Sequence, residues 1–198
     1  MDKHKTCSFF GHRKIDLNEE LKLRVKEVVE NLIVNHNVCC FLFGSRSEFD
    51  KLCHLVVTEL KTKYSFIKRV AYTCKSESCL LEAEREKIEA MYAKITKRKI
   101  SLRGFEEEVE HNAKYTAGKA GYVERNRAMI DDSDFCVFFY DKDYVLPTRK
   151  CSSRGARFYR PQSGTALAYS YAKKKQKKLM NIFNYNHSFA SGEKALEF

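Results

Sequence analysis

The sequence predicts an α/β fold in a single domain, with a mainly parallel β-sheet covered by helices on both faces. Short apolar runs rich in β-branched and aromatic residues alternate with longer amphipathic stretches, as expected for parallel strands joined by helices. Several apolar runs are continuous, which is typical of strands buried on both faces. At 198 residues, the chain has room for one domain with a substantial core, so we expect residues 1–198 to form one unit.

Five apolar runs are predicted as strands. They are residues 6–10, 38–43, 67–72, 134–140 and 178–183.

Four of the intervening stretches predict helices that connect these strands. The first, within residues 16–35, has apolar side chains close to helical spacing and Asp16 as its expected N-cap. The second, within residues 47–64, begins at Ser47, which is also a good N-cap. The other two, within residues 118–133 and 163–177, begin with glycine and small residues.

Two stretches are less regular. Residues 74–116 contain one helical pattern and then change from basic to acidic with little periodicity, so we expect an insertion-like segment after the helix. Residues 141–162 separate a strand from a helix by about twenty residues, a length that usually marks a functional loop. We expect this loop to cover a site. The tail from residue 185 carries no pattern.

The chain is strongly basic, with a formal net charge of +11, which predicts attraction to an anionic partner. Basic residues cluster at 97–103 and at 173–178, where solvated helix ends and loops are the ordinary explanation. No apolar run is long enough to cross a bilayer, and the N-terminus lacks a secretory signal pattern. We therefore expect a cytoplasmic protein without a membrane partner.

The eight cysteines are expected to be reduced thiols. Cys39 and Cys40 are adjacent in a predicted strand and point to opposite faces. Cys74, Cys79 and the Cys53–His54 pair lack the paired short spacings of a zinc site. The sequence predicts no metal site and no required cofactor.

Three glycine-containing turns follow predicted strands or precede a helix, and all are expected at the carboxyl ends of the strands, where open parallel sheets bind ligands. Glycine lets a backbone N–H approach an oxyanion closely, and a helix N-terminus supplies unpaired N–H groups. Arginine adds a planar, bidentate donor for phosphate. The turns are Gly11-His12-Arg13, Gly44-Ser45-Arg46 followed by Ser47-Glu48-Phe49, and Ser163-Gly164-Thr165.

A fourth candidate element is the predicted helix near Gly118 and Gly121, which carries Glu124, Arg125 and Asn126. Successive helical positions fan out around the axis, so these three side chains cannot all face one ligand. Two aromatic side chains beside glycine turns, Phe49 and Tyr122, are candidates for stacking on a base. The other phenylalanines of the predicted strands are expected in the core.

The motifs CSFFGHR, FGSRSEFD, KAGYVERNRAMIDDSDFCVFFYD and QSGTALAYSYAKKKQKKLMNIF resemble, in order, those of the YpsA-type branch of the SLOG superfamily, named for the DprA and Lonely Guy proteins. The resemblance extends over residues 6–183 and is weakest between 74 and 115. It implies a Rossmann-like fold and a nucleotide or nucleotide-derived ligand. It also implies a pocket lined by Gly11, Arg13, Gly44, Ser45, Arg46, Glu48, Arg125, Asn126, Ser163, Gly164 and Thr165.

The same resemblance bears on catalysis. Lonely Guy phosphoribohydrolases carry a catalytic Glu three residues after the Thr of this turn, where the present chain has Ala168. The first hypothesis is therefore a binding module that senses or sequesters an ADP-ribose-like or cyclic nucleotide signal. The second is a nucleoside or nucleotide N-glycosidase, with Glu124 or Glu48 as the carboxylate and His12 as an acid or base.

A third hypothesis is weak binding of single-stranded DNA through the lysine clusters, although the sequence shows no basic groove studded with aromatic residues. Homo-oligomer formation stays open beside all three hypotheses, because nothing in the residue pattern decides it.

Overall fold

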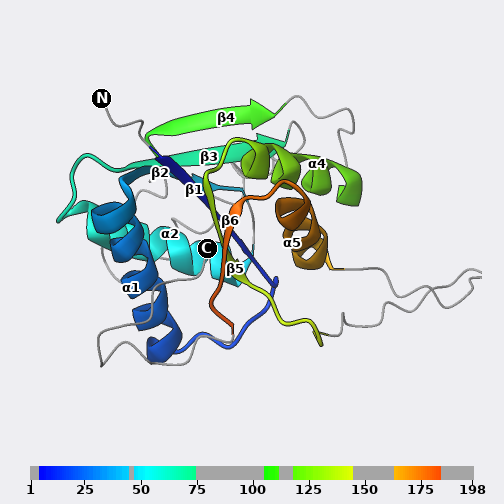
Figure 1. Ribbon diagram of the computed structural model, residues 1–198, viewed down its shortest axis with the longest axis horizontal. Helices are drawn as coiled ribbons and strands as arrows, with labels where there is room; N and C mark the ends of the chain where they lie inside the picture. The colour runs from blue at the N-terminus through cyan, green and yellow to red at the C-terminus, as the bar shows by residue number, and fades with distance from the viewer. Residues whose placement is uncertain (1–4, 45–46, 75–104, 112–117, 145–162, 184–198) are drawn as a thin grey trace, which may run out of the picture.

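The computed structural model describes residues 5–44, 47–74, 105–111, 118–144 and 163–183, and the structural statements below concern these residues. They form a parallel sheet with helices on both faces (Figure 1), which confirms the predicted α/β fold. The strands are β1 (Lys5–Gly11), β2 (Val38–Phe43), β3 (Lys68–Cys74), β4 (Glu107–His111), β5 (Phe135–Phe139) and β6 (Lys178–Asn181). The helices are α1 (Glu19–His36), α2 (Glu48–Lys61), α4 (Gly118–Asp131) and α5 (Gly164–Lys174).

Strand order in the sheet is β4-β3-β2-β1-β5-β6, and every neighbouring pair is parallel. Five of these strands, β3-β2-β1-β5-β6, correspond to the five predicted apolar runs, and β4 is an additional strand. β1 is central, with Cys7 paired to Phe41 of β2 on one side and to Phe135 of β5 on the other. The chain thus builds outward from β1 in one direction and then returns to build in the other.

Two apolar clusters cover the two faces of the sheet. Side chains of α1 and α2 pack on one face around Phe9, Phe41 and Phe43. Side chains of α4 and α5 pack on the other face around Phe10 and Phe138. Because consecutive strand residues point to opposite faces, Phe9 and Phe10 anchor different layers. Figure 1 shows these helix pairs on opposite sides of the sheet.

The start of α1 differs from the prediction. Asn18, not Asp16, is its N-cap, and the Asn18 side-chain oxygen accepts a hydrogen bond from the Leu21 amide at 2.8 Å. The helix therefore begins at Glu19, and Leu17 is left 52% exposed. Ser47 and Ser163 do cap α2 and α5, each accepting from the amide three residues later.

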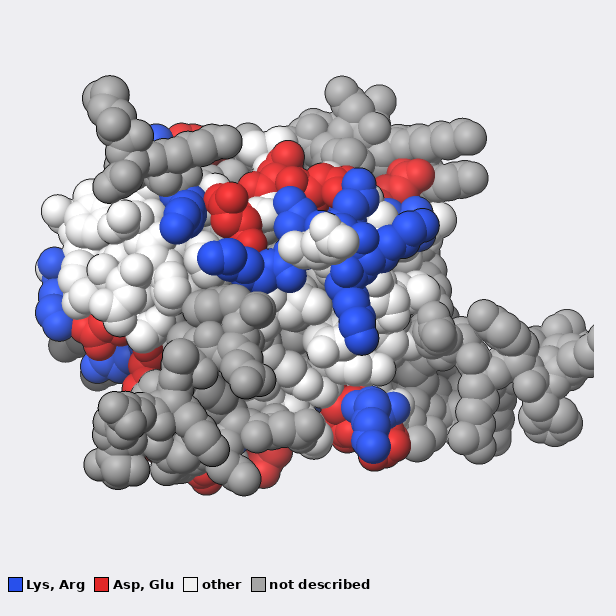
Figure 2. Space-filling model, in the orientation of Figure 1, with Lys and Arg blue, Asp and Glu red and all other residues white. Residues whose placement is uncertain are grey.

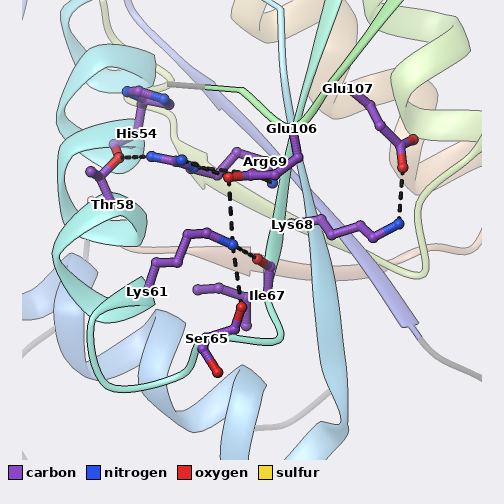
Figure 3. A network of polar contacts seen from close by, with 9 residues as sticks. All are labelled: His54, Thr58, Lys61, Ser65, Ile67, Lys68, Arg69, Glu106 and Glu107. Carbon is purple, nitrogen blue, oxygen red and sulfur yellow. Dashed lines mark hydrogen bonds and ion pairs between the residues drawn. The ribbon is translucent and has the colours of Figure 1, made fainter. Parts of the chain in front are cut away.

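The described residues near the end of the segment 74–116 form a regular strand, in contrast to the predicted irregular segment. Residues Glu107–His111 form β4, which pairs with β3 from Val70 to Cys74. Arg69, which is 9% exposed, joins the two strands by donating two side-chain hydrogen bonds to the Glu106 carboxylate, with Nη2–Oε1 at 2.6 Å and Nε–Oε2 at 3.2 Å. Figure 3 shows this contact together with Thr58 and Lys61 of α2. The predicted helix of this segment lies outside the described residues.

Among the described helices, none is both long and apolar enough to span a membrane. The described cysteines with placed side chains are free thiols. Burial raises the pKa of the Cys7 and Cys53 thiols well above the ordinary value, so both stay protonated and act as apolar core residues.

Candidate functional site

The strand order changes direction at β1: β2, β3 and β4 lie on one side of β1, and β5 and β6 lie on the other. The segments that follow the neighbouring strands β1 and β5 lead to opposite faces of the sheet, because α1 covers one face and α5 the other. In open α/β sheets, such a topological switch point leaves a crevice outside the carboxyl ends of the strands. The loops that begin at His12 and Tyr140 border this position.

His12 links the two loops. Its ring is 2% exposed, and its Nε2 accepts a hydrogen bond from the Asp141 amide at 3.0 Å. The ring also stacks on Tyr144, with centroids 3.8 Å apart and planes inclined by 14°. His12 therefore holds the start of the β5 loop against the end of β1.

The protonation of His12 follows from these contacts. Burial lowers the pKa of His12 below its ordinary value, although its interactions with Asp141 act in the opposite direction. An Nε2 that accepts a hydrogen bond carries no proton, so the neutral ring carries its proton on Nδ1. Nδ1 is buried and has no hydrogen-bond partner among the described residues. Such a buried donor requires an explanation, because buried polar groups are usually paired.

Gly11 makes room for a protein side chain. A Cβ built on Gly11 would lie 2.4 Å from Cβ of Phe49, so only glycine permits this approach. Phe49 is fully buried and also packs against Phe139, with centroids 5.6 Å apart. The structure thus places Phe49 in the core beneath the rim, where its ring is unavailable for stacking on a base. The space at Gly11 that the sequence suggested for a ligand is filled by Phe49.

Glu48 stabilises the loop after β1 through two hydrogen bonds. Its carboxylate accepts a hydrogen bond from the Ile15 amide at 2.8 Å, and its own amide donates to the Arg13 carbonyl at 3.1 Å. These two bonds attach residues 13–15 to the start of α2. Arg13 itself is exposed at the rim, where its guanidinium remains accessible to solvent.

Gly44 brings α4 close to the end of β2. A Cβ on Gly44 would lie 2.3 Å from Sδ of Met129 and 2.9 Å from Nε of Arg125. Arg125 is 2% exposed, its Nη2 donates to the Asn126 side chain at 3.3 Å, and its guanidinium lies 5.3 Å from the Tyr122 ring centroid. The predicted pocket residues Gly44, Arg125 and Asn126 are therefore in contact, while Tyr122 packs against Arg125.

The start of α5 is open. Ser163 caps the helix, Thr165 is buried in its first turn, and Gly164 is exposed with no atom within 4 Å of the position of a Cβ. Gly164 also lines a small depression with Asn126 of α4. One turn later, Tyr169 stacks on Tyr140 with centroids 4.7 Å apart. The Ala166 amide of the first turn of α5 is bonded to the Ser163 cap, and the N–H groups before it, which have no acceptor within the helix, lie near the β5 loop.

Other predicted residues are only partly described. Gly118 begins α4, and Glu124 is half-buried on the same helix. Ser45, Arg46 and most of the predicted covering loop lie outside the described residues. Sequence reasoning missed Asp141 and Tyr144, because neither belongs to a glycine turn. The sequence did contain a signal for the contact between these loops: a histidine directly follows one predicted strand, and an aromatic residue follows the strand that pairs with it.

The described basic residues of the C-terminal cluster lie at the other end of the sheet. Lys178 begins β6 and pairs in register with Phe135 at the start of β5, so this cluster is at the amino ends of the strands. Within the described part of the chain, no group of three His, Cys, Asp or Glu side chains is arranged to hold a metal ion.

No protein-family model matches the chain, and no curated protein matches it. The class that the structure itself defines is a Rossmann-like parallel α/β protein.

Proposed function

We propose that the chain binds a nucleotide or nucleotide-derived ligand at the switch point between β1 and β5, as a sensor or sequestering module of the YpsA-type SLOG branch. The observation that carries this proposal is the buried Nδ1–H of His12, a donor beside the crevice that has no acceptor among the described residues. A ligand oxygen is a suitable acceptor. The ligand class itself comes from the motif resemblance.

The residues around this position suit an anionic ligand. The open first turn of α5 supplies N–H groups and the positive end of the helix dipole. Arg13 is exposed at the same rim and offers the bidentate geometry that phosphate oxygens accept. An ADP-ribose-like or cyclic nucleotide has the phosphate that these groups favour.

Hydrolysis of an N-glycosidic bond is the less supported alternative. One candidate carboxylate, Glu48, accepts a hydrogen bond from the Ile15 amide and so serves the loop. The position that would carry the Lonely Guy glutamate is Ala168, which lies on the buried side of α5, in the apolar cluster with Phe10 and Phe138. Incubation with nucleoside monophosphates and NAD tests this alternative, since release of free base that depends on Glu48 or Glu124 would establish an enzyme.

The binding proposal is tested with Gly164→Asp. A carboxylate in the first turn of a helix interacts favourably with the helix dipole, so α5 should remain folded. The added negative charge, however, repels an anionic ligand. Ser170→Asp, at an exposed position farther along α5, adds the same charge away from the first turn. We expect nucleotide recovered from heat-denatured wild-type protein and from Ser170→Asp, and at least tenfold less from Gly164→Asp.

Thermal shift with added ADP-ribose, cyclic AMP and AMP provides the second measurement, with stabilisation expected for wild type and Ser170→Asp alone. The proposal is overturned if the wild type neither releases a nucleotide nor responds to these probes. If Gly164→Asp and wild type retain equal amounts of nucleotide, the start of α5 is not part of the binding site.

A further inference from the structure

A basic surface lies where the end of α4, the end of α5 and the start of β6 meet. Figure 2 shows Lys and Arg side chains gathered over this part of the molecule, beside a row of Asp and Glu side chains. We call it the amino-end basic surface, because it lies at the amino ends of β5 and β6. Its described members are Arg127, Lys173, Lys174, Lys175, Lys177 and Lys178.

An aromatic ring lies within this surface. The guanidinium carbon of Arg127 is 5.2 Å from the centroid of the Tyr171 ring, and Nζ of Lys175 is 5.3 Å from it. Tyr171 is half-buried, whereas Arg127 and Lys175 are exposed. Residues separated by about 45 positions in the sequence thus form one aromatic and cationic cluster, which the sequence pattern does not reveal.

Asp131 positions this cluster and offsets the charge of one of its lysines. Its carboxylate accepts from the Tyr171 hydroxyl at 2.9 Å and pairs with Lys175 at 3.1 Å. Lys177 donates instead to the carbonyls of Asp131 and Ser133, and it forms no ion pair with a carboxylate of the described residues.

Lys173 and Lys174 add two further charges at the end of α5. Both are exposed, and within the described part of the chain neither forms an ion pair. Their flexible stems allow the ammonium groups to follow a ligand backbone.

We propose that the amino-end basic surface binds single-stranded nucleic acid. The lysines contact successive phosphates, and Tyr171 stacks on a base when the exposed Arg127 or Lys175 side chain moves from the ring to a phosphate. A positively charged surface with an aromatic ring is the combination that recognises single strands without sequence preference. An acidic peptide would use the charges but has no general need for the ring.

The first test compares two double variants with the same change in charge. Lys173→Gln/Lys174→Gln removes two charges from the surface, and Lys26→Gln/Lys51→Gln removes two exposed charges from α1 and α2 on the opposite face. Fluorescence anisotropy with labelled 20-mers of oligo(dT) and oligo(U) measures affinity between about 50 and 300 mM salt.

We expect the Lys173/Lys174 variant to bind about tenfold more weakly at low salt. Its slope of log affinity against log salt should fall in magnitude by roughly 1.4, because each single-strand phosphate contact contributes about 0.7. The Lys26/Lys51 variant should stay within about twofold of wild type. If both variants bound the oligonucleotide equally weakly, the attraction would depend on net charge alone, and the proposal that this surface is the binding site would be wrong.

The second test examines the ring. Tyr171→Leu should weaken oligonucleotide binding at least about fivefold through loss of base stacking, while Tyr171→Phe should retain affinity, because it keeps the ring and loses only the hydroxyl bonded to Asp131. Circular dichroism establishes that each variant is folded. Two results would contradict nucleic-acid binding and favour an acidic protein partner. One is that Tyr171→Leu has no effect on oligonucleotide binding. The other is that polyglutamate competes as strongly as unlabelled oligonucleotide of equal charge.

Discussion

Glycines at the rim of the sheet act mainly by letting protein atoms approach closely. Gly11 admits Phe49, and Gly44 admits Met129 and Arg125. Gly164 differs, because its Cβ position is empty. The sequence predicts a turn at each of these positions, but it cannot distinguish a glycine that accommodates the core from one that leaves space for a ligand, since both precede a helix.

This difference predicts opposite effects of alanine. Gly11→Ala should destabilise the protein by about 1–3 kcal/mol, because the new methyl group overlaps the buried Phe49. Gly164→Ala should be neutral or stabilise by up to about 1 kcal/mol, because alanine favours the helix and meets no atom. Urea unfolding of both variants measures the free energies. Equal stability of the two variants would show that Phe49 does not pack against Gly11.

The N-cap of α1 shows a second limit at this scale. Asp16 and Asn18 are both good capping residues just before the same helix. The choice depends on where the apolar face first meets the sheet, and Leu21, rather than Leu17, is the first buried position. Local preference therefore predicted the helix and missed its start by two residues.

Among the elements, the strands that run through apolar sequence were predictable and β4 was not. β4 is Glu-rich, and glutamate is depleted in strands because it gains little from a half-buried surface. Its attachment depends on Arg69, which is distant in sequence from Glu106. The Glu106 carboxylate also accepts from the Arg69 backbone amide at 2.6 Å, and the Arg69 Nη1 donates to the Thr58 hydroxyl at 2.8 Å, so a tertiary contact outweighs strand preference.

The Arg69–Glu106 contact predicts an acid-dependent stability. Burial alone would raise the pKa of Glu106, but the hydrogen bonds and charge of Arg69, together with the charge of Lys61, lower it to about 2. Since the native pKa lies below that of the unfolded chain, the ionised carboxylate stabilises the fold above about pH 4.5. This contribution should be lost as the pH falls from about 4.5 toward 2.

Glu106→Gln tests this directly. The variant should be less stable by about 1–2 kcal/mol at pH 7, because it leaves the nearly buried Arg69 without its countercharge. Glu107→Gln is the matched control. Glu107 forms an exposed ion pair with Lys68, and its replacement should cost less than about 0.5 kcal/mol. Urea unfolding at pH 7, 5 and 3 should show the Glu106 deficit shrinking at pH 3. A constant deficit would assign the loss to packing instead of charge.

For the whole molecule, alternation of strands and helices predicts a parallel sheet but not its order. The placement of β5 beside β1 comes from tertiary packing. The Asp134 amide donates to the Thr6 carbonyl, and the Thr6 amide donates to the Asp134 carboxylate. That order creates the switch point where His12 meets Asp141, and it places the C-terminal lysines at the other end. Composition shows that the chain is basic, whereas only the fold shows where these charges lie relative to the rim glycines.

The separation of the two surfaces predicts that they bind independently. They are connected by α5, which begins at Gly164 and ends at Lys174, a distance of about 15 Å at the rise of an α-helix. This exceeds the Debye length of about 8 Å at physiological salt, so a charge added at one end is largely screened at the other. Distant sites without shared contacts are additive.

Crossed measurements on the variants test this independence. Gly164→Asp should bind labelled oligo(dT) within about twofold of wild type at 150 mM salt, and Lys173→Gln/Lys174→Gln should retain the nucleotide that wild type retains. The triple variant should show both defects at the sizes of the parent variants. If Gly164→Asp weakened oligonucleotide binding as much as the lysine variant does, both ligands would share one site, and two separate surfaces on opposite ends of the sheet would be wrong.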